Sequence, residues 1–158
     1  FKVYHPLAFY AAYFSIRAKA FDLRIMTGDL KTQMTEFNRI KALDRGASPK
    51  DKDLMSALEV SMEMYQRGYR FVNVDIQHSE ARRFSIKDGA LLPPFLAIDS
   101  LGETVADAIV AEREERPFTS LKDLQRRCKV SNTIIDLMKE LKCCGELPED
   151  EQMSLFGA

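Results

Sequence analysis

Hydrophobic side chains recur at helical spacing over the first 68 residues, and this pattern predicts a series of helices. Pro6 stands at a favourable first position of a run that is apolar or aromatic nearly all round, so this helix should be buried on most sides. A short helix or turn is expected over residues 21–28, and a longer helix over residues 29–46. The sequence from Ser48 to Asp51 is a strong start signal for another helix, which should end at Gly68.

The hydrophobic period changes after Gly68. Residues 71–76 alternate between apolar and polar, which predicts a half-buried strand. Residues 81–87, an Asp88-Gly89 turn and residues 90–92 predict a β-hairpin. This small antiparallel element should join two helical halves of the chain, and nothing in it resembles a catalytic site.

Residues 95–113 predict a short apolar turn of helix, a tight Ser100-Leu101-Gly102 hairpin and a longer amphipathic helix. We expect Gly102 to supply the backbone freedom that the sharp turn requires. The pattern is typical of the helix-hairpin-helix motif, in which backbone N–H groups at a helix N-terminus meet a DNA phosphate. The alternative is an ordinary helical corner with a glycine turn.

A second helix-turn-helix follows. Ser120 with Asp123 forms a capping box for a helix through Arg127, and Ser131 caps a last helix that Gly145 ends. The predicted fold is therefore mainly α with a small antiparallel β element and a tandem helix-hairpin-helix-like C-terminal domain.

Charge limits how such a domain binds DNA. The chain has 23 basic and 24 acidic residues, and the second half, residues 80–158, is net acidic. Any DNA contact must therefore be local, with few phosphates and a shallow dependence on salt. The densest basic cluster has no interleaved aromatic residues, which favours duplex over single-stranded DNA, although a solvated helix face is an open alternative. The candidate DNA-binding residues are Ser100, Leu101, Gly102, Glu103, Thr104, Arg113, Lys122, Arg126, Arg127 and Lys129.

Other chemistry is sparse. The three cysteines are odd in number and two are adjacent, which fits a reducing cytoplasm better than a disulfide framework. No run is long and apolar enough to cross a bilayer and no signal peptide is visible, so a cytoplasmic location without membrane contact is expected. The chain has no grouped carboxylates, metal-ligand set or activated nucleophile, so we predict no catalytic and no metal-binding residues in it.

The end of the chain carries a second motif. The acidic segment 148–151 should be disordered. It leads to Gln152-Met153-Ser154-Leu155-Phe156, in which an amide that donates and accepts is followed by aliphatic and aromatic anchors. Such a peptide suits a hydrophobic pocket on a partner. It resembles the sliding-clamp-binding motif of bacterial replication proteins.

The resemblance extends over almost the whole chain. Five segments carry it, namely YHPLAFYAAYFSIRA, LEVSMEMYQRGYRF, residues 91–111 with 113–117, FTSLKDLQRR and QMSLF. Together they resemble the C-terminal end of the PolC-type DNA polymerase III alpha subunit, the replicative polymerase of low-GC Gram-positive bacteria. Since the chain also begins inside an apolar run, we expect it to be a fragment of a larger protein.

This resemblance implies three parts. Residues 1–79 would form the end of the polymerase fingers and their junction, residues 80–147 a duplex-binding domain behind the active site, and residues 148–158 a flexible clamp tether. The partners would be duplex DNA, the sliding clamp and the remainder of the polymerase chain. The fragment would hold no cofactor, whereas the full polymerase would use Mg²⁺.

One departure from the family matters. Asp99-Ser100 stands where the family's hairpin typically has Pro-Gly. Either the acid beside the expected phosphate weakens the contact, or its side chain caps the hairpin instead. Two alternatives stay open: a helical adaptor that binds only protein, and a helix-hairpin-helix DNA repair protein. A repair glycosylase often needs a four-cysteine iron–sulfur cluster, which three cysteines cannot supply.

Overall fold

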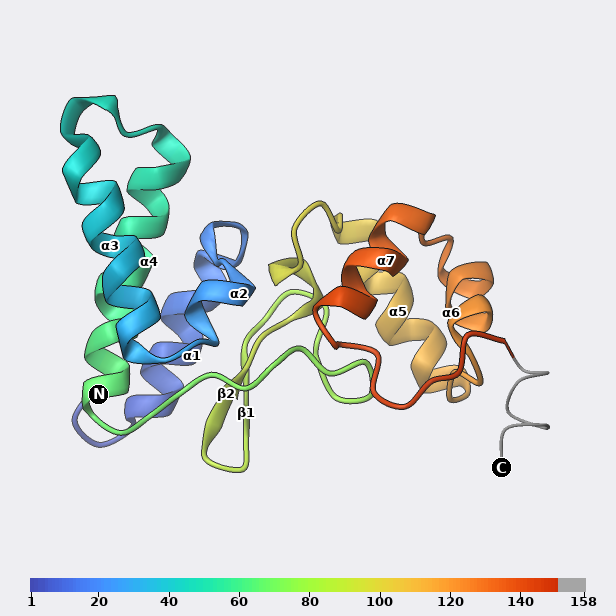
Figure 1. The fold of residues 1–158 in the computed structure, drawn as a ribbon. Coiled ribbons are helices and arrows are strands. Elements are labelled where there is room, and N and C mark those ends of the chain that lie inside the picture. Colours follow the sequence, from blue (N-terminus) through green and yellow to red (C-terminus); the bar gives the residue numbers. More distant parts are fainter. Residues whose placement is uncertain (151–158) are drawn as a thin grey trace.

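The computed structural model describes residues 1–150, and most of them lie in helices (Figure 1). The α-helices are α1 (Pro6–Ile16), α2 (Leu23–Met26), α3 (Leu30–Leu43), α4 (Pro49–Gln66), α5 (Glu103–Glu115), α6 (Leu121–Cys128) and α7 (Asn132–Glu140). The short 3-10 helices are η1 (Ala18–Ala20), η2 (Asp44–Gly46) and η3 (Phe95–Ala97). The strands are β1 (Ser85–Lys87) and β2 (Ala90–Leu92). The predicted fold class, mainly helical with one small antiparallel sheet, is confirmed.

Helices α3 and α4 form an antiparallel pair that projects from one end of the molecule (Figure 1). Capping explains where α4 begins: Ser48 accepts a hydrogen bond from the Asp51 N–H, and the Asp51 carboxylate accepts one from the Ser48 N–H. Helix α1 is buried less completely than its composition predicts. Tyr10 and Phe14 are enclosed, but Ile16 at its end is 82% exposed.

An aromatic cluster joins the helical N-terminal half to the sheet. Phe14 of α1 lies with its ring centroid 4.9 Å from that of Phe71 and 5.8 Å from that of Phe84. Phe21 lies 4.8 Å from Phe71 in an edge-to-face arrangement. These rings come from four separate segments, so the core is continuous between the two halves.

The predicted strand over residues 71–76 is wrong. Within it, only Phe71 forms a bridge, a single parallel one to Leu91. Beyond that point the chain leaves the sheet, and the Ile76 N–H donates to the carbonyl of Cys143 instead. The alternation reflected burial alone, since Val74 and Ile76 are buried without a continuous ladder. The hairpin is confirmed with a shorter first strand, and both turn residues, Asp88 and Gly89, have positive φ.

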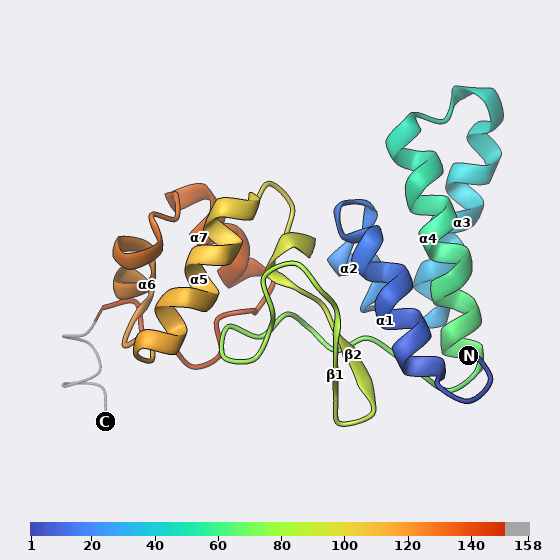
Figure 2. The same ribbon diagram turned by 180° about the vertical axis from the view of Figure 1, so that it is seen from behind.

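Helices α5, α6 and α7 lie together at one end of the molecule (Figure 2). They pack around fully buried side chains, among them Ile109, Leu124 and Met138. The acidic segment that follows was expected to be disordered, but residues 148–150 lie against α6. The Pro148 carbonyl accepts from the Leu121 N–H at 2.8 Å, and the Glu149 carbonyl accepts from the Lys122 N–H at 3.1 Å. The candidate clamp motif, Gln152 to Phe156, lies outside the described residues.

None of the helices in residues 1–150 is long and apolar enough to span a membrane.

Candidate nucleic-acid interface

The first hairpin has its unusual conformation at Ser100. Ser100 has φ 65°, Leu101 is only 4% exposed, and Gly102 is the extended N-cap of α5 with φ −79° and ψ 167°. The expectation that Gly102 supplies the backbone freedom is therefore wrong. A Cβ at Gly102 would meet no atom within 4 Å, so neither backbone conformation nor space demands glycine there. The side chain of Leu101 instead anchors the turn in the core.

The turn between α6 and α7 repeats this geometry. Lys129 has φ 56°, Val130 is 4% exposed, and Ser131 is the N-cap of α7 with φ −69° and ψ 158°. Residues 100–102 and 129–131 thus share one order: a left-handed residue, a buried aliphatic residue and an extended N-cap. The candidate DNA-binding set included Lys129 but missed the N–H groups that follow Ser131. The sequence did offer a signal for this second turn, because the aliphatic residue and N-cap Val130-Ser131 match Leu101-Gly102 of the first.

Both turns lie toward the same side of the molecule, the upper side in Figures 1 and 2. The first N–H groups of α5 and α7 have no acceptor within their helices, and each helix adds partial positive charge at this end. Gly102 offers no capping side chain to α5, whereas the Ser131 hydroxyl accepts from the Ile134 N–H. Two helix ends suited to anions therefore face one side.

The candidate cations differ in their distance from the turns and in the partners of their side chains. Lys129 is exposed, and its side chain makes no hydrogen bond or ion pair within residues 1–150. Arg126, one turn earlier, has a side chain 69% exposed that pairs with Asp123 at 2.8 Å. Lys122 lies at the opposite end of α6 from Lys129 and pairs with Asp150 at 2.8 Å. Among these candidate cations, only Lys129 and Arg126 lie near the second hairpin, the turn at residues 129–131.

Arg127 and Arg113 have structural roles instead. The Arg127 side chain is 7% exposed and contacts the carboxylates of Asp123 and Glu112 at 3.2 and 3.1 Å. Arg113 donates to the backbone carbonyls of Ile76 at 3.0 Å and Ser79 at 2.8 Å, and burial lowers its pKa from the ordinary arginine value. Their hydrogen bonds hold the domain together, so these arginines do not add to the exposed charge near the hairpins.

Asp123 is the buried centre of that network. Burial raises the pKa of its carboxyl, but the hydrogen bond from the Thr119 N–H and the nearby Arg127 and Arg116 lower it, with a net downward direction. Asp123 is therefore ionised in the folded protein and neutralised by arginines on both sides.

Acidic side chains flank the first hairpin. Asp99 is exposed, as is Glu103, whose carboxylate lies 3.4 Å from the Arg82 guanidinium. Arg82 also pairs with Asp107 at 2.6 Å. Thr104 is exposed on the first turn of α5. The first hairpin thus combines favourable backbone groups with an unfavourable local charge at Asp99.

Comparisons with known proteins agree with this geometry. A family model described as a helix-hairpin-helix motif matches residues 68–152. The chain is 44% identical over 156 residues to the protein named DNA polymerase III PolC-type of Caldanaerobacter subterraneus, and 46% identical over 159 residues to that of Streptococcus suis. That of Streptococcus pyogenes is 44% identical over 159 residues. Each alignment covers 99% of this chain but 11% of the relative. The resemblance to PolC-type polymerases is confirmed.

Proposed function

Since the chain belongs to the helix-hairpin-helix family, we propose that residues 80–147 bind duplex DNA without sequence preference. The observation that carries this proposal is the shared backbone geometry of the turns at residues 100–102 and 129–131, which lie on one side of the molecule. One DNA phosphate at each turn would accept hydrogen bonds from the first N–H groups of α5 or α7. Phosphate contacts position a duplex but read no bases, so binding would be the same for all sequences.

The charges favour modest affinity. Lys129 and Arg126 would add long-range attraction at the second turn, and Asp99 would oppose it at the first. With few phosphates engaged, binding should depend shallowly on salt. Such weak contact suits a module that holds DNA only together with other parts of a larger protein.

Lys129→Asn tests this proposal. Asparagine tolerates the left-handed conformation, so the turn should survive while the charge is lost. Combined with Arg126→Gln, it should weaken binding of unrelated duplexes equally and reduce the salt slope by about 1 to 2. Fluorescence anisotropy at several salt concentrations measures both quantities, and Lys31→Gln in α3 is the control. Unchanged affinity at low salt would remove the support for this surface.

We infer further that the chain is a non-catalytic portion of a replicative DNA polymerase, acting in the cytoplasm. The support is its similarity to PolC-type polymerases, of which it spans about a ninth. Polymerisation would belong to other parts of such a protein, and Mg²⁺ would be used there. The purified chain with primed template, Mg²⁺ and nucleotides should give no primer extension. Extension that persists through rigorous purification would contradict this inference.

The remainder of the polymerase chain is the proposed neighbour of α1. Val3 and Tyr4, just before this helix, are 78% and 84% exposed, and Ile16 at its end is 82% exposed. Large apolar side chains this exposed favour contact with another protein surface. We assign these exposed side chains to contacts with other parts of the polymerase.

The segment Gln152 to Phe156 is the proposed sliding-clamp ligand. Leu155 and Phe156 would be the anchors, and burying both would contribute roughly 3–6 kcal/mol before ordering costs. Micromolar affinity is expected for the peptide alone. Since Asp150 pairs with Lys122, only Glu151 separates this anchored segment from the motif, so the clamp would lie beside the DNA-binding domain.

Calorimetry with a bacterial sliding clamp tests the assignment. The double variant Leu155→Ala, Phe156→Ala should lose measurable binding, and Met153→Leu should retain it because the volume is conserved. Equal affinity of the double variant and the wild-type chain would contradict the clamp proposal.

A further inference from the structure

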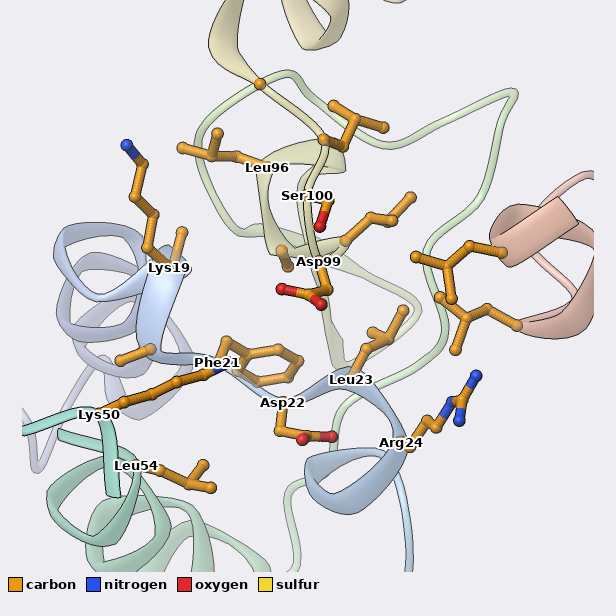
Figure 3. Close-up of a pocket in the computed structure, with 18 residues that line it drawn as sticks. Lys19, Phe21, Asp22, Leu23, Arg24, Lys50, Leu54, Leu96, Asp99 and Ser100 are labelled. Atoms are coloured by element: carbon orange, nitrogen blue, oxygen red, sulfur yellow. The ribbon is translucent and has the colours of Figure 1, made fainter. Parts of the chain in front are cut away.

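A groove separates the first hairpin from the N-terminal helices (Figure 3). Its volume is about 570 Å³. One wall is formed by residues 18–24 together with the start of α4, and the other by residues 96–102 together with α7. The hairpin proposed to contact DNA therefore forms one edge of this groove.

The wall opposite the hairpin carries two available cations. Lys19 of η1 and Lys50 in the first turn of α4 both line the groove and are exposed. Neither side chain makes a hydrogen bond or an ion pair within residues 1–150. The third cation of this wall, Arg24, is occupied by Glu140 of α7 at 2.8 Å.

Two acids, Asp22 and Asp99, also line the groove. The Asp22 carboxylate accepts the Ile25 N–H at 3.1 Å and so caps α2. Asp99 is exposed beside the hairpin. The wall formed by residues 18–24 and the start of α4 carries three cations and one acid, so it is the cationic side, whereas the only charged residue of the hairpin wall is Asp99.

We propose that the duplex bound at the hairpins continues across this groove, so that Lys19 and Lys50 contact its phosphates. The inference rests on the proposed DNA binding of residues 80–147 and adds a contact outside them. Figures 1 and 2 place the free end of the α3–α4 pair on the same side as both turns, so one duplex can meet all three. A duplex carries one charge per about 1.7 Å of axis, so both lysines meet a phosphate whatever the sequence.

The groove also has apolar side chains, including Leu23, Leu54 and Leu96. A protein segment is therefore the competing occupant. The uncompensated lysines and the direct continuity with the hairpin favour DNA, because an apolar segment would leave both charges without a partner.

The test is a double variant, Lys19→Gln with Lys50→Gln, in the 158-residue chain. Its binding to a duplex of about 20 base pairs, two helical turns, is compared with its binding to one of about 10 base pairs. We expect the longer duplex to bind the double variant about fivefold more weakly than it binds the wild-type chain, with a salt slope smaller by about 1.8. The shorter duplex, which the hairpins alone can hold, should lose less. Lys31→Gln with Arg83→Gln, two exposed cations that do not line the groove, is the control.

The outcomes distinguish the groove contact from the hairpin proposal on which it rests. If Lys129→Asn weakens binding and the groove variant does not, the groove contact is wrong and the hairpin proposal stands. If neither variant weakens binding, both are wrong. A groove variant that lowers affinity for single-stranded DNA more than for duplex also overturns the proposal, as does a loss equal to that of the control.

Discussion

At the scale of single residues, the first hairpin depends on where the left-handed conformation falls. It falls on Ser100, at φ 65°, and not on Gly102. A β-branched residue is strained in this region, whereas serine is tolerated at a cost and glycine adopts it freely. The small residue at Gly102 is therefore an N-cap, and serine is an equally good one.

Substitutions at these two positions should separate the roles. Gly102→Ser should change the free energy of unfolding by less than about 0.5 kcal/mol, because Gly102 has ordinary φ and open space. Ser100→Val should lower it by more than about 1 kcal/mol, and Ser100→Gly should raise it by roughly 0.5–1 kcal/mol. Urea unfolding followed by circular dichroism measures all three. Greater damage from Gly102→Ser than from Ser100→Val would contradict this assignment.

Asp123 predicts a pH dependence. Its carboxyl pKa is lowered in the folded state, so its contribution to stability is present above the unfolded value of 3.8 and is lost as pH falls through the folded value. Asp123→Asn should lower the free energy of unfolding at pH 7 by roughly 2–4 kcal/mol, because Arg127 loses its buried partner.

The variant should also lose less stability than wild type on acidification below about pH 4. Chemical unfolding at pH 7 and pH 3 measures the difference, with the exposed Asp136→Asn as control. Parallel pH profiles for Asp123→Asn and wild type would show that this carboxyl is not the ionised centre of the network.

At the scale of elements, the segment 148–150 covers the start of α6. Glu149 pairs with Lys139, and Asp150 with Lys122. Exposed ion pairs contribute little to stability, but each one neutralises a cation that could attract DNA. We therefore expect this segment to lower the affinity for DNA while adding little to the free energy of unfolding.

The double variant Glu149→Gln, Asp150→Asn should raise duplex affinity a few fold at low salt. The free energy of unfolding should change by less than about 1 kcal/mol, because the backbone bonds from α6 remain. Asp53→Asn with Glu59→Gln removes the same charge from exposed positions of α4, away from Lys122 and Lys139, and is the matched control. An equal gain from the control would mean that net charge alone, and not release of Lys122 and Lys139, sets the affinity.

Local signals were sufficient to predict the helices. Caps such as Ser48, Ser120 and Ser131 act within one turn of chain, so a sequence displays them directly. The strand over residues 71–76 failed because strand formation depends on a distant partner. The partner of Ile76 is Cys143, which no local pattern reveals.

The sequence predicted the position of the hairpin turn, but not which cations near it are free of other contacts. The hairpin pattern located residues 100–104, whereas the availability of each cation depends on tertiary contacts. Arg113 donates to carbonyls 37 and 34 residues away, and Arg127 pairs with Glu112, 15 residues away, whereas the Lys129 side chain has no such partner among residues 1–150. Lys19 and Lys50, which we propose as further contacts, were not predictable for the same reason, because only the folded chain brings them to the hairpin's groove.

At the scale of the whole molecule, the two halves share one core. Leu91 exchanges backbone hydrogen bonds with residues on either side of Phe71, and the Phe84 N–H donates to the Ser15 hydroxyl at 2.9 Å. Arg113 of α5 fixes the carbonyls of Ile76 and Ser79. A boundary between residues 79 and 80 runs through all of these contacts. These contacts hold the predicted parts 1–79 and 80–147 together, so we expect the two parts to fold as one unit.

We accordingly expect the chain to unfold in a single cooperative transition. Phe14 precedes Phe84 of the second half by 70 residues in sequence, yet it packs against both Phe84 and Phe71. Phe14→Ala should lower the free energy of unfolding by roughly 3–5 kcal/mol, and the loss should be the same when probed in either half. Hydrogen exchange of α4 and α7 provides those probes, and Phe1→Ala, at a residue 75% exposed, is the control. If Phe14→Ala accelerates exchange in α4 while α7 keeps its wild-type protection, the halves fold separately and the shared aromatic core does not couple them.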